Sequence, residues 1–362
     1  MTTRDMTPRE RVEAILLHRD ADHVPFTVYQ QFIPQCEEER RLRNEGLCIV
    51  DPSFNVFETE CPDVTETVCY YREDGKDKVR TDIKTPAGDL FSVGMIAEID
   101  SVSATTTWVE QRVFKGPEDY RAIEFWIRNR VHTPDYEPFL RADQMAGGDL
   151  MLRASIGLEP LQEIIISLMG LERFSFEWAD NRDEVLRLYQ ALVDDRRKIY
   201  PIVAQSPALH ANYGGNVVSE IVGPRLFEQY LLPDYQECAE VMHKHGKLVG
   251  THLDANNKGI ASLVAKSDLD YIEAFTPYPD TDMTLKEALD AWPDKVLWIP
   301  FPSSTHLHGP EAVERTALDL LEQSKPGNRL IVGLTEDVPE ALWQESFSII
   351  SHVLNTRGRL PI

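Results

Sequence analysis

A histidine and an aspartate two residues apart follow a short apolar stretch in the second half of the chain. The segment KLVGTHLD, residues 247–254, is apolar until it reaches His252 and Asp254, and an Ala-Asn-Asn turn follows. If the segment is a β-strand, its side chains alternate, so His252 and Asp254 point to the same side. An imidazole and a carboxylate placed in this way can bind a divalent metal ion, or they can hydrogen-bond to each other and to a loop.

Polar residues also end other strand-like segments of the chain. Burying an unpaired charge is costly, so a series of apolar strands that end in charged groups predicts one shared polar pocket. The residues at these ends are Arg153, Tyr213, Asn216, His252, Asp254, Glu273, Thr335, Glu336 and Asp337.

The acids among these residues predict a metal site. His252, Asp254 and Glu336 form a plausible set of ligands for a divalent metal ion, because imidazole and carboxylate groups from neighbouring strands would converge on it. Glu273 could be a further ligand, or it could orient His252 by a hydrogen bond.

The remaining strand-end residues favour binding of a small molecule. Arg153 could bind a substrate carboxylate through two hydrogen bonds, or it could form a salt bridge to an acid of the pocket. We place Asn216 with Arg153 among the predicted substrate-binding residues. The chain contains neither a GxGxxG nor a P-loop pattern, so a nucleotide-binding fold is not indicated.

Strand-like and helix-like segments alternate from about residue 148 to the C-terminus. This order predicts a parallel sheet with right-handed crossovers. About eight candidate strands, counting PFTVY at 25–29 and one uncertain strand, fit an α/β fold of the (β/α)8 TIM-barrel type. In such a barrel the active site lies at the carboxyl ends of the strands, where the polar residues would meet.

A β-rich stretch interrupts this alternation in the N-terminal part of the chain. Within residues 55–115, VTETVCYY and KVRTDIKT are rich in β-branched residues, and EDGK between them is typical of a hairpin turn. We predict a β-rich insertion in a single barrel domain that spans residues 1–362. The insertion could be a lid or the surface of a homodimer.

The composition excludes several classes of function. The chain has 37 lysine and arginine residues against 60 aspartate and glutamate residues, a formal net charge of −23, which repels nucleic acid and anionic membranes. Its five cysteines form no CxxC pair, so we expect them to be reduced. The N-terminus is charged and no apolar run approaches the length of a membrane span. We therefore expect no signal peptide, no membrane segment and a cytoplasmic location.

Three segments resemble the uroporphyrinogen decarboxylase superfamily, which includes corrinoid- and thiol-dependent methyltransferases. They are TPRERVEAILLHRDADHVPF, GPRLFEQYLLPDYQECAEVMHKHGKLVGTHLDAN, and GLTEDVP with the closing helix to GRLPI. The resemblance implies a TIM-type barrel and, for the methyltransferase branch, a zinc ion and a corrinoid carrier. Zinc methyltransferases of the family typically carry His-x-Cys where this chain has His252 and Asp254. Glu336 replaces a later Cys, and such an oxygen-rich site argues against a thiol as the methyl acceptor.

Two enzymatic hypotheses and one binding hypothesis follow. The first is a metal-dependent methyltransferase that moves a methyl group from a small O- or N-methylated compound to a corrinoid on a partner protein, with Glu273 or Tyr213 handling a proton. The second is a metal-independent decarboxylase or lyase acting on a carboxylated small molecule, with His252 and Asp254 as hydrogen-bonded acid and base groups. The third is a barrel that binds a ligand without turnover.

Overall fold

Eight parallel strands close into a barrel, which confirms the predicted TIM-type fold. The computed structural model describes residues 6–96 and 108–362. Around the barrel the strand order is β1-β14-β13-β12-β11-β10-β9-β2. The strands are β1 (Phe26–Tyr29), β2 (Leu47–Phe54), β9 (Leu150–Gly157), β10 (His210–Tyr213), β11 (Leu248–His252), β12 (Tyr271–Glu273), β13 (Val296–Pro300) and β14 (Leu330–Leu334).

The strand that the sequence left uncertain is β2. It contains Asp51 and Pro52, a pair that is more typical of a turn, and its register with β9 shifts between Asp51 and Phe54. Pairing with β1 on one side and β9 on the other holds this irregular segment in the sheet. Local propensity alone would not have assigned it to a strand.

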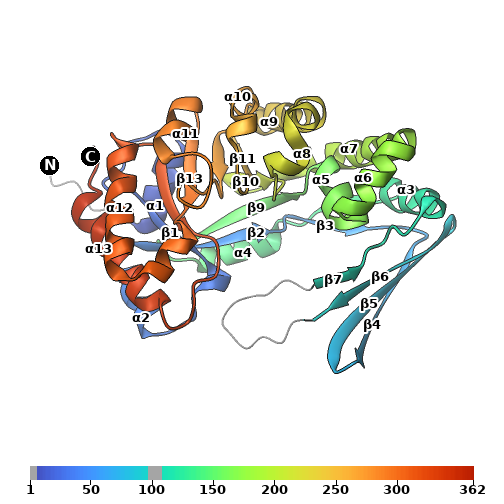
Figure 1. Cartoon of the computed structure of the whole chain (residues 1–362), viewed down its shortest axis with the longest axis horizontal. Helices are drawn as coiled ribbons and strands as arrows, with labels where there is room; N and C mark the ends of the chain where they lie inside the picture. Colours follow the sequence, from blue (N-terminus) through green and yellow to red (C-terminus); the bar gives the residue numbers. More distant parts are fainter. Residues whose placement is uncertain (1–5, 97–107) are drawn as a thin grey trace.

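The predicted β-rich insertion lies between β2 and β9. Strands β4 (Thr65–Glu73), β5 (Lys76–Thr85), β6 (Gly88–Met95) and β7 (Trp108–Gln111) form an antiparallel sheet, and β3 (Phe57–Glu60) pairs with β8 (Val131–Pro134). The predicted hairpin is confirmed, since β4 pairs with β5 across a turn at Asp74 and Gly75. Figure 1 shows the four-stranded sheet extending away from the barrel.

Helices surround the barrel on its outer side (Figure 1). No helix in the described ranges combines the length and the apolar character needed to cross a membrane. The α-helices are α1 (Pro8–Leu16), α2 (Glu37–Asn44), α3 (Tyr120–Arg128), α4 (Glu137–Met145), α5 (Pro160–Gln162), α6 (Leu171–Asp180), α7 (Arg182–Ala204), α8 (Ser219–Leu226), α9 (Leu232–Lys244), α10 (Ala261–Val264), α11 (Leu285–Ala291), α12 (Pro310–Ser324) and α13 (Trp343–Arg357).

Helix α1 closes the N-terminal end of the barrel. Its first turn is held by a capping box between Thr7 and Glu10. Its apolar residues Val12, Ile15 and Leu16 belong to the same buried cluster as side chains that fill the barrel interior. Because this end is filled, the polar residues at the opposite, carboxyl end of the strands are the ones a ligand can approach.

Candidate active site at the barrel mouth

The carboxyl ends of β10, β11 and β12 carry strained backbone. Asn216, Ala255 and Ala274 follow these strands, and each has a positive φ, of 56°, 48° and 60°. Side chains with a Cβ atom rarely adopt this conformation, and such strain is concentrated at functional sites. The backbone therefore supports a site at this end of the barrel, which we call the mouth.

His252, the last residue of β11, contacts two carboxylates at the mouth. Its Nδ1 atom is 2.7 Å from Oε2 of Glu273, and its Nε2 atom is 3.0 Å from Oδ1 of Asp254. The Glu273 side chain is fully buried, whereas 22% of the His252 side chain and 33% of the Asp254 side chain are exposed. Both ring nitrogens face acceptors, so both donate when the imidazole is protonated.

Glu273 also binds the first barrel strand and β9. Its Oε1 atom accepts a hydrogen bond of 2.5 Å from the hydroxyl of Tyr29, and its Oε2 atom is 3.4 Å from Nη1 of Arg153. Arg153 in turn donates from Nη2 to the Tyr29 hydroxyl and from Nε to the Pro52 carbonyl, both at 2.9 Å. These residues, Tyr29, Arg153, His252, Asp254 and Glu273, are the mouth cluster.

The electrostatics of the cluster favour its charged forms. Burial alone would raise the pKa of Glu273, but the charges of His252 and Arg153 outweigh it and lower that pKa to about 2. Burial alone would lower the pKa of His252, but Glu273 and Asp254 raise it to about 10. At neutral pH the mouth therefore holds an imidazolium between two carboxylates.

The structure does not bring the three predicted metal ligands, His252, Asp254 and Glu336, together around one point. Glu336 lies two residues beyond β14, is exposed, and accepts a hydrogen bond from the hydroxyl of Ser303, which begins the 3-10 helix η6 (Ser303–His308). Within residues 6–96 and 108–362, no three His, Cys, Asp or Glu side chains are grouped so that they could hold a metal ion. The ring nitrogens of His252 both face carboxylates. The side chains present therefore do not fit the predicted ion.

Tyr213 does not face the mouth. Alternation along β10 directs His210 inward, where its ring lies against Tyr271 and Trp298. Tyr213, three residues later, lies on the outer face of the barrel wall and is fully buried. Its hydroxyl is 2.8 Å from that of Tyr200 on α7. It is therefore not placed to exchange a proton with a substrate in the mouth.

The other predicted binding residues differ in position. Arg153 belongs to the mouth cluster, but its side chain is only 3% exposed and lies against Glu273, the salt-bridge alternative in the sequence analysis. Asn216 is exposed in the loop after β10, and its carbonyl accepts a hydrogen bond from Gln162. Thus Arg153 contacts Tyr29 and Glu273 within the cluster, whereas Asn216 is exposed in the loop after β10.

Two groups near the mouth were missed from the sequence. Tyr29 ends PFTVY, and its strand-end position could have indicated it. Glu159 follows β9 by two residues, as Asp254 follows β11. It is fully buried, accepts hydrogen bonds from the Tyr235 hydroxyl and the Gly215 amide, and has a pKa raised to about 7 by burial. A Cβ atom on Gly214 would overlap its carboxylate, which explains the glycine there.

The comparisons with known proteins agree with the fold. No protein-family model matches the chain, and no curated protein does. Among solved structures, a methyltransferase from Methanosarcina mazei shares 12% identity with the chain and has a TM-score of 0.56. The alignment covers 97% of this chain and 98% of that one. At this identity the similarity shows the fold alone.

Two glycosidase structures are more distant. The GH18 chitinase ChiB of Flavobacterium johnsoniae has 11% identity and a TM-score of 0.35, with 62% of this chain and 81% of that chain covered. A structure of the GH20 modules of the pneumococcal exo-beta-D-N-acetylglucosaminidase StrH has 10% identity and a TM-score of 0.38, with coverages of 95% and 87%. With TM-scores this low, neither carries an argument about this chain.

Proposed function

We propose that the chain is an enzyme that transfers a methyl group from a small O- or N-methylated compound to a nucleophilic acceptor. The proposed acceptor is a corrinoid carried by a partner protein, which supplies the nucleophile when it is bound. The observation that carries the proposal is the position of the His252 imidazole between the carboxylates of Glu273 and Asp254 at the carboxyl end of the barrel, which raises its pKa and favours its protonated form. Methyl transfer from oxygen or nitrogen needs such an acid, because the departing heteroatom is otherwise a strong base.

The proton on Nε2 is the one available to the leaving group. The Nδ1 proton is directed to the fully buried Glu273, whereas the Nε2 proton is directed to Asp254, which is one-third exposed. In the reaction the bond between carbon and the heteroatom breaks, the methyl group bonds to the acceptor, and the heteroatom takes the Nε2 proton. Solvent then returns a proton to His252. The negative charges of Glu273 and Asp254 favour this reprotonation of the imidazole.

Replacement of His252 tests this role. The full-length chain is incubated with a panel of O- and N-methylated compounds and with free cob(I)alamin as the acceptor, and the demethylated product is measured. His252→Gln should lower the rate by at least about 100-fold, the usual range for loss of a general acid. His245→Gln is the matched control, because His245 is exposed at the C-terminal end of α9. A rate that survives His252→Gln would refute the proposal.

Chelator treatment of the same preparation tests the predicted zinc separately. Because the mouth does not group three ligands, the proposal assigns no step to a metal ion. We expect the purified chain to retain activity after treatment with a chelator. Loss of activity on chelation, restored by zinc, would show that the ligands rearrange around an ion and would restore the metal-dependent hypothesis.

A decarboxylase or lyase is the second candidate, and two contacts favour it. His252 and Asp254 are hydrogen-bonded to each other, as this hypothesis expects. The Nη1 atom of Arg153 makes no hydrogen bond among the described residues, and it donates to a substrate carboxylate if its ion pair with Glu273, at 3.4 Å, is exchanged for the substrate. Release of CO2 from carboxylated compounds in the absence of any methyl acceptor would favour this candidate over methyl transfer.

A further inference from the structure

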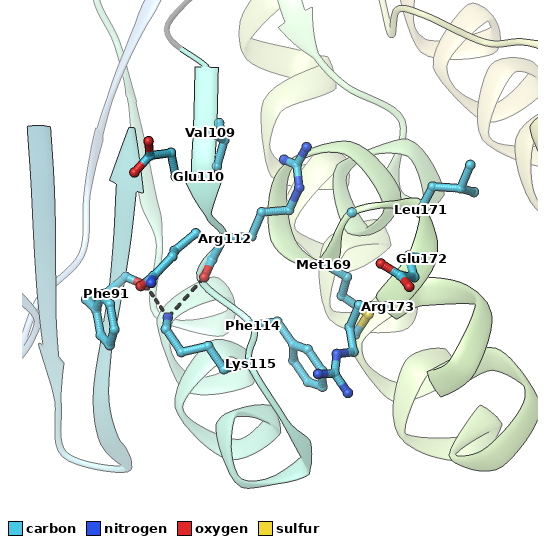
Figure 2. Close-up of a pocket in the computed structure, with 12 residues that line it drawn as sticks. Phe91, Val109, Glu110, Arg112, Phe114, Lys115, Met169, Leu171, Glu172 and Arg173 are labelled. Carbon is cyan, nitrogen blue, oxygen red and sulfur yellow. Dashed lines mark hydrogen bonds between the residues drawn. The ribbon is translucent and has the colours of Figure 1, made fainter. Parts of the chain in front are cut away.

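A second hollow, away from the mouth, lies between the β-rich sheet and the helical layer. Its volume is about 650 Å³, and no barrel strand contributes to it. One wall is formed by Phe91 of β6, by β7 and by the segment 112–115, and the other by Met169 and the first residues of α6. Figure 2 shows these two facing walls, and we call the space between them the side cavity.

Two cations of the side cavity form no ion pair with a carboxylate of the residues that the structure describes. Arg112 donates from Nη1 to the main-chain carbonyl of Ile166. Lys115 donates from Nζ to the carbonyls of Phe91, Arg112 and Val113, the last two at 3.0 and 3.1 Å, and its Nζ atom lies 3.8 Å from the centre of the Phe91 ring. The Asp119 carboxylate, which accepts a hydrogen bond from the Lys115 amide at 2.7 Å, offsets part of its charge. Among the described residues, neither cation forms an ion pair with an acid, and burial lowers the pKa of both.

The acids that line the side cavity do not neutralise these charges. Glu110 forms an ion pair at 2.8 Å with Lys78, which also pairs with Glu73 at 3.0 Å, and not with Arg112 or Lys115 among the described residues. Glu172 is exposed at the start of α6 and, in the part of the chain that the structure describes, it forms no ion pair with Arg112 or Lys115. Among the described residues, the desolvated positive charge of Arg112 therefore has no carboxylate partner and that of Lys115 is offset only in part, by Asp119. An anion would compensate it.

The rest of the lining suits an apolar group next to that anion. Phe114 and Met169 are buried and form part of the wall, and Leu171, also in the lining, is exposed. Arg173, also in the lining, offers a second guanidinium, since its only ion pair in the described ranges is a long one of 3.9 Å to Glu177. A volume of this size accommodates a small organic molecule.

We propose that the side cavity binds an anionic small molecule with an apolar body. The anionic group, a carboxylate or a phosphate, is bound by the guanidinium of Arg112, and the apolar body packs against Phe114 and Met169. Lys115 and, at the other end of the cavity, Arg173 add positive charge to the lining (Figure 2). A guanidinium is suited to either anion because it offers two parallel donors. The site is separate from the mouth cluster, so it does not depend on the proposed methyl transfer.

Calorimetric titration of the full-length chain tests the proposal with three octyl compounds, each below its micelle concentration. Octanoate and octyl phosphate carry the anion, and octanamide carries the same tail without charge. We expect at least one anion to bind about ten-fold or more tightly than octanamide, since a charge-assisted hydrogen bond contributes about 1.5–3 kcal/mol. A preference for octyl phosphate would indicate a phosphorylated ligand, and a preference for octanoate a carboxylic acid.

Variants assign the binding to this cavity. Arg112→Gln should weaken binding of the preferred anion by about ten-fold or more. Arg173→Gln should weaken it less, and it is a second test should Arg112→Gln not fold, because Arg173 is 46% exposed. The control Arg315→Gln, an exposed arginine on α12, should bind as the unmodified chain does. Equal binding of octanamide and the anions, no binding of either anion, or unchanged binding by both cavity variants would overturn the proposal.

Discussion

At the barrel mouth, Arg153 and His252 lie against the carboxylate of Glu273, whereas in the side cavity Arg112 and Lys115 contact main-chain carbonyls and an aromatic ring. The mouth cations are therefore balanced within the protein, and their positions are held by several hydrogen bonds. The cavity cations are not balanced by acids of the described chain. The difference suggests that the mouth is preorganised for a reaction and that the cavity is completed by a ligand.

The largest expected difference between the two regions is in how much the free energy of unfolding falls when a glutamate is replaced. Glu273→Gln removes a fully buried carboxylate and leaves the charges of Arg153 and His252 without their inner partner. Breaking a buried pair in this way typically costs about 3–5 kcal/mol, so the free energy of unfolding in denaturant should fall by that amount. The matched control is Glu172→Gln in the side cavity, which is exposed and should change it by less than about 0.5 kcal/mol. If both variants changed the free energy of unfolding by the same small amount, the proposed difference between the mouth and the side cavity would be wrong.

The pH dependence of stability should also differ between the unmodified chain and His252→Gln. The folded pKa of His252, about 10, lies above the value of about 6.5 expected in the unfolded chain. The stabilisation from its charged form is thus fully present below about pH 6.5 and is lost as the pH rises through 10. Unfolding measured at pH 6, 8 and 10 should show a decline with pH that is smaller in His252→Gln. Parallel profiles of the two proteins would mean that the imidazolium is not stabilised at the mouth.

The smallest expected effect concerns the side cavity in the absence of ligand. Arg112→Gln removes a cation that has no acidic partner among the described residues, so the free energy of unfolding should stay within about 1 kcal/mol of the unmodified chain. The same denaturant titration as for Glu273→Gln measures it. A loss as large as that of Glu273→Gln would show that Arg112 is a structural residue and would remove the contrast between the regions.

Sequence reasoning located part of the mouth. The strand-end rule found His252, Asp254, Glu273 and Arg153, all of which the structure brings together. The same rule failed for Tyr213, because the direction of a side chain depends on strand register, and a displacement by one residue exchanges the inner and outer faces. It failed for Glu336 because that residue lies beyond β14, where the conformation of the loop, and not alternation along the strand, sets the direction of the side chain.

By itself, the sequence determined the barrel, the β4–β5 hairpin and the common orientation of His252 and Asp254. These features depend on periodicity, turn residues and alternation over a few neighbouring positions. Only the tertiary structure decided that Tyr29 bonds to Glu273, 244 positions away, and that the imidazole of His252 lies between two carboxylates. Such contacts depend on barrel closure, strand register and the burial of charge, which no local pattern encodes.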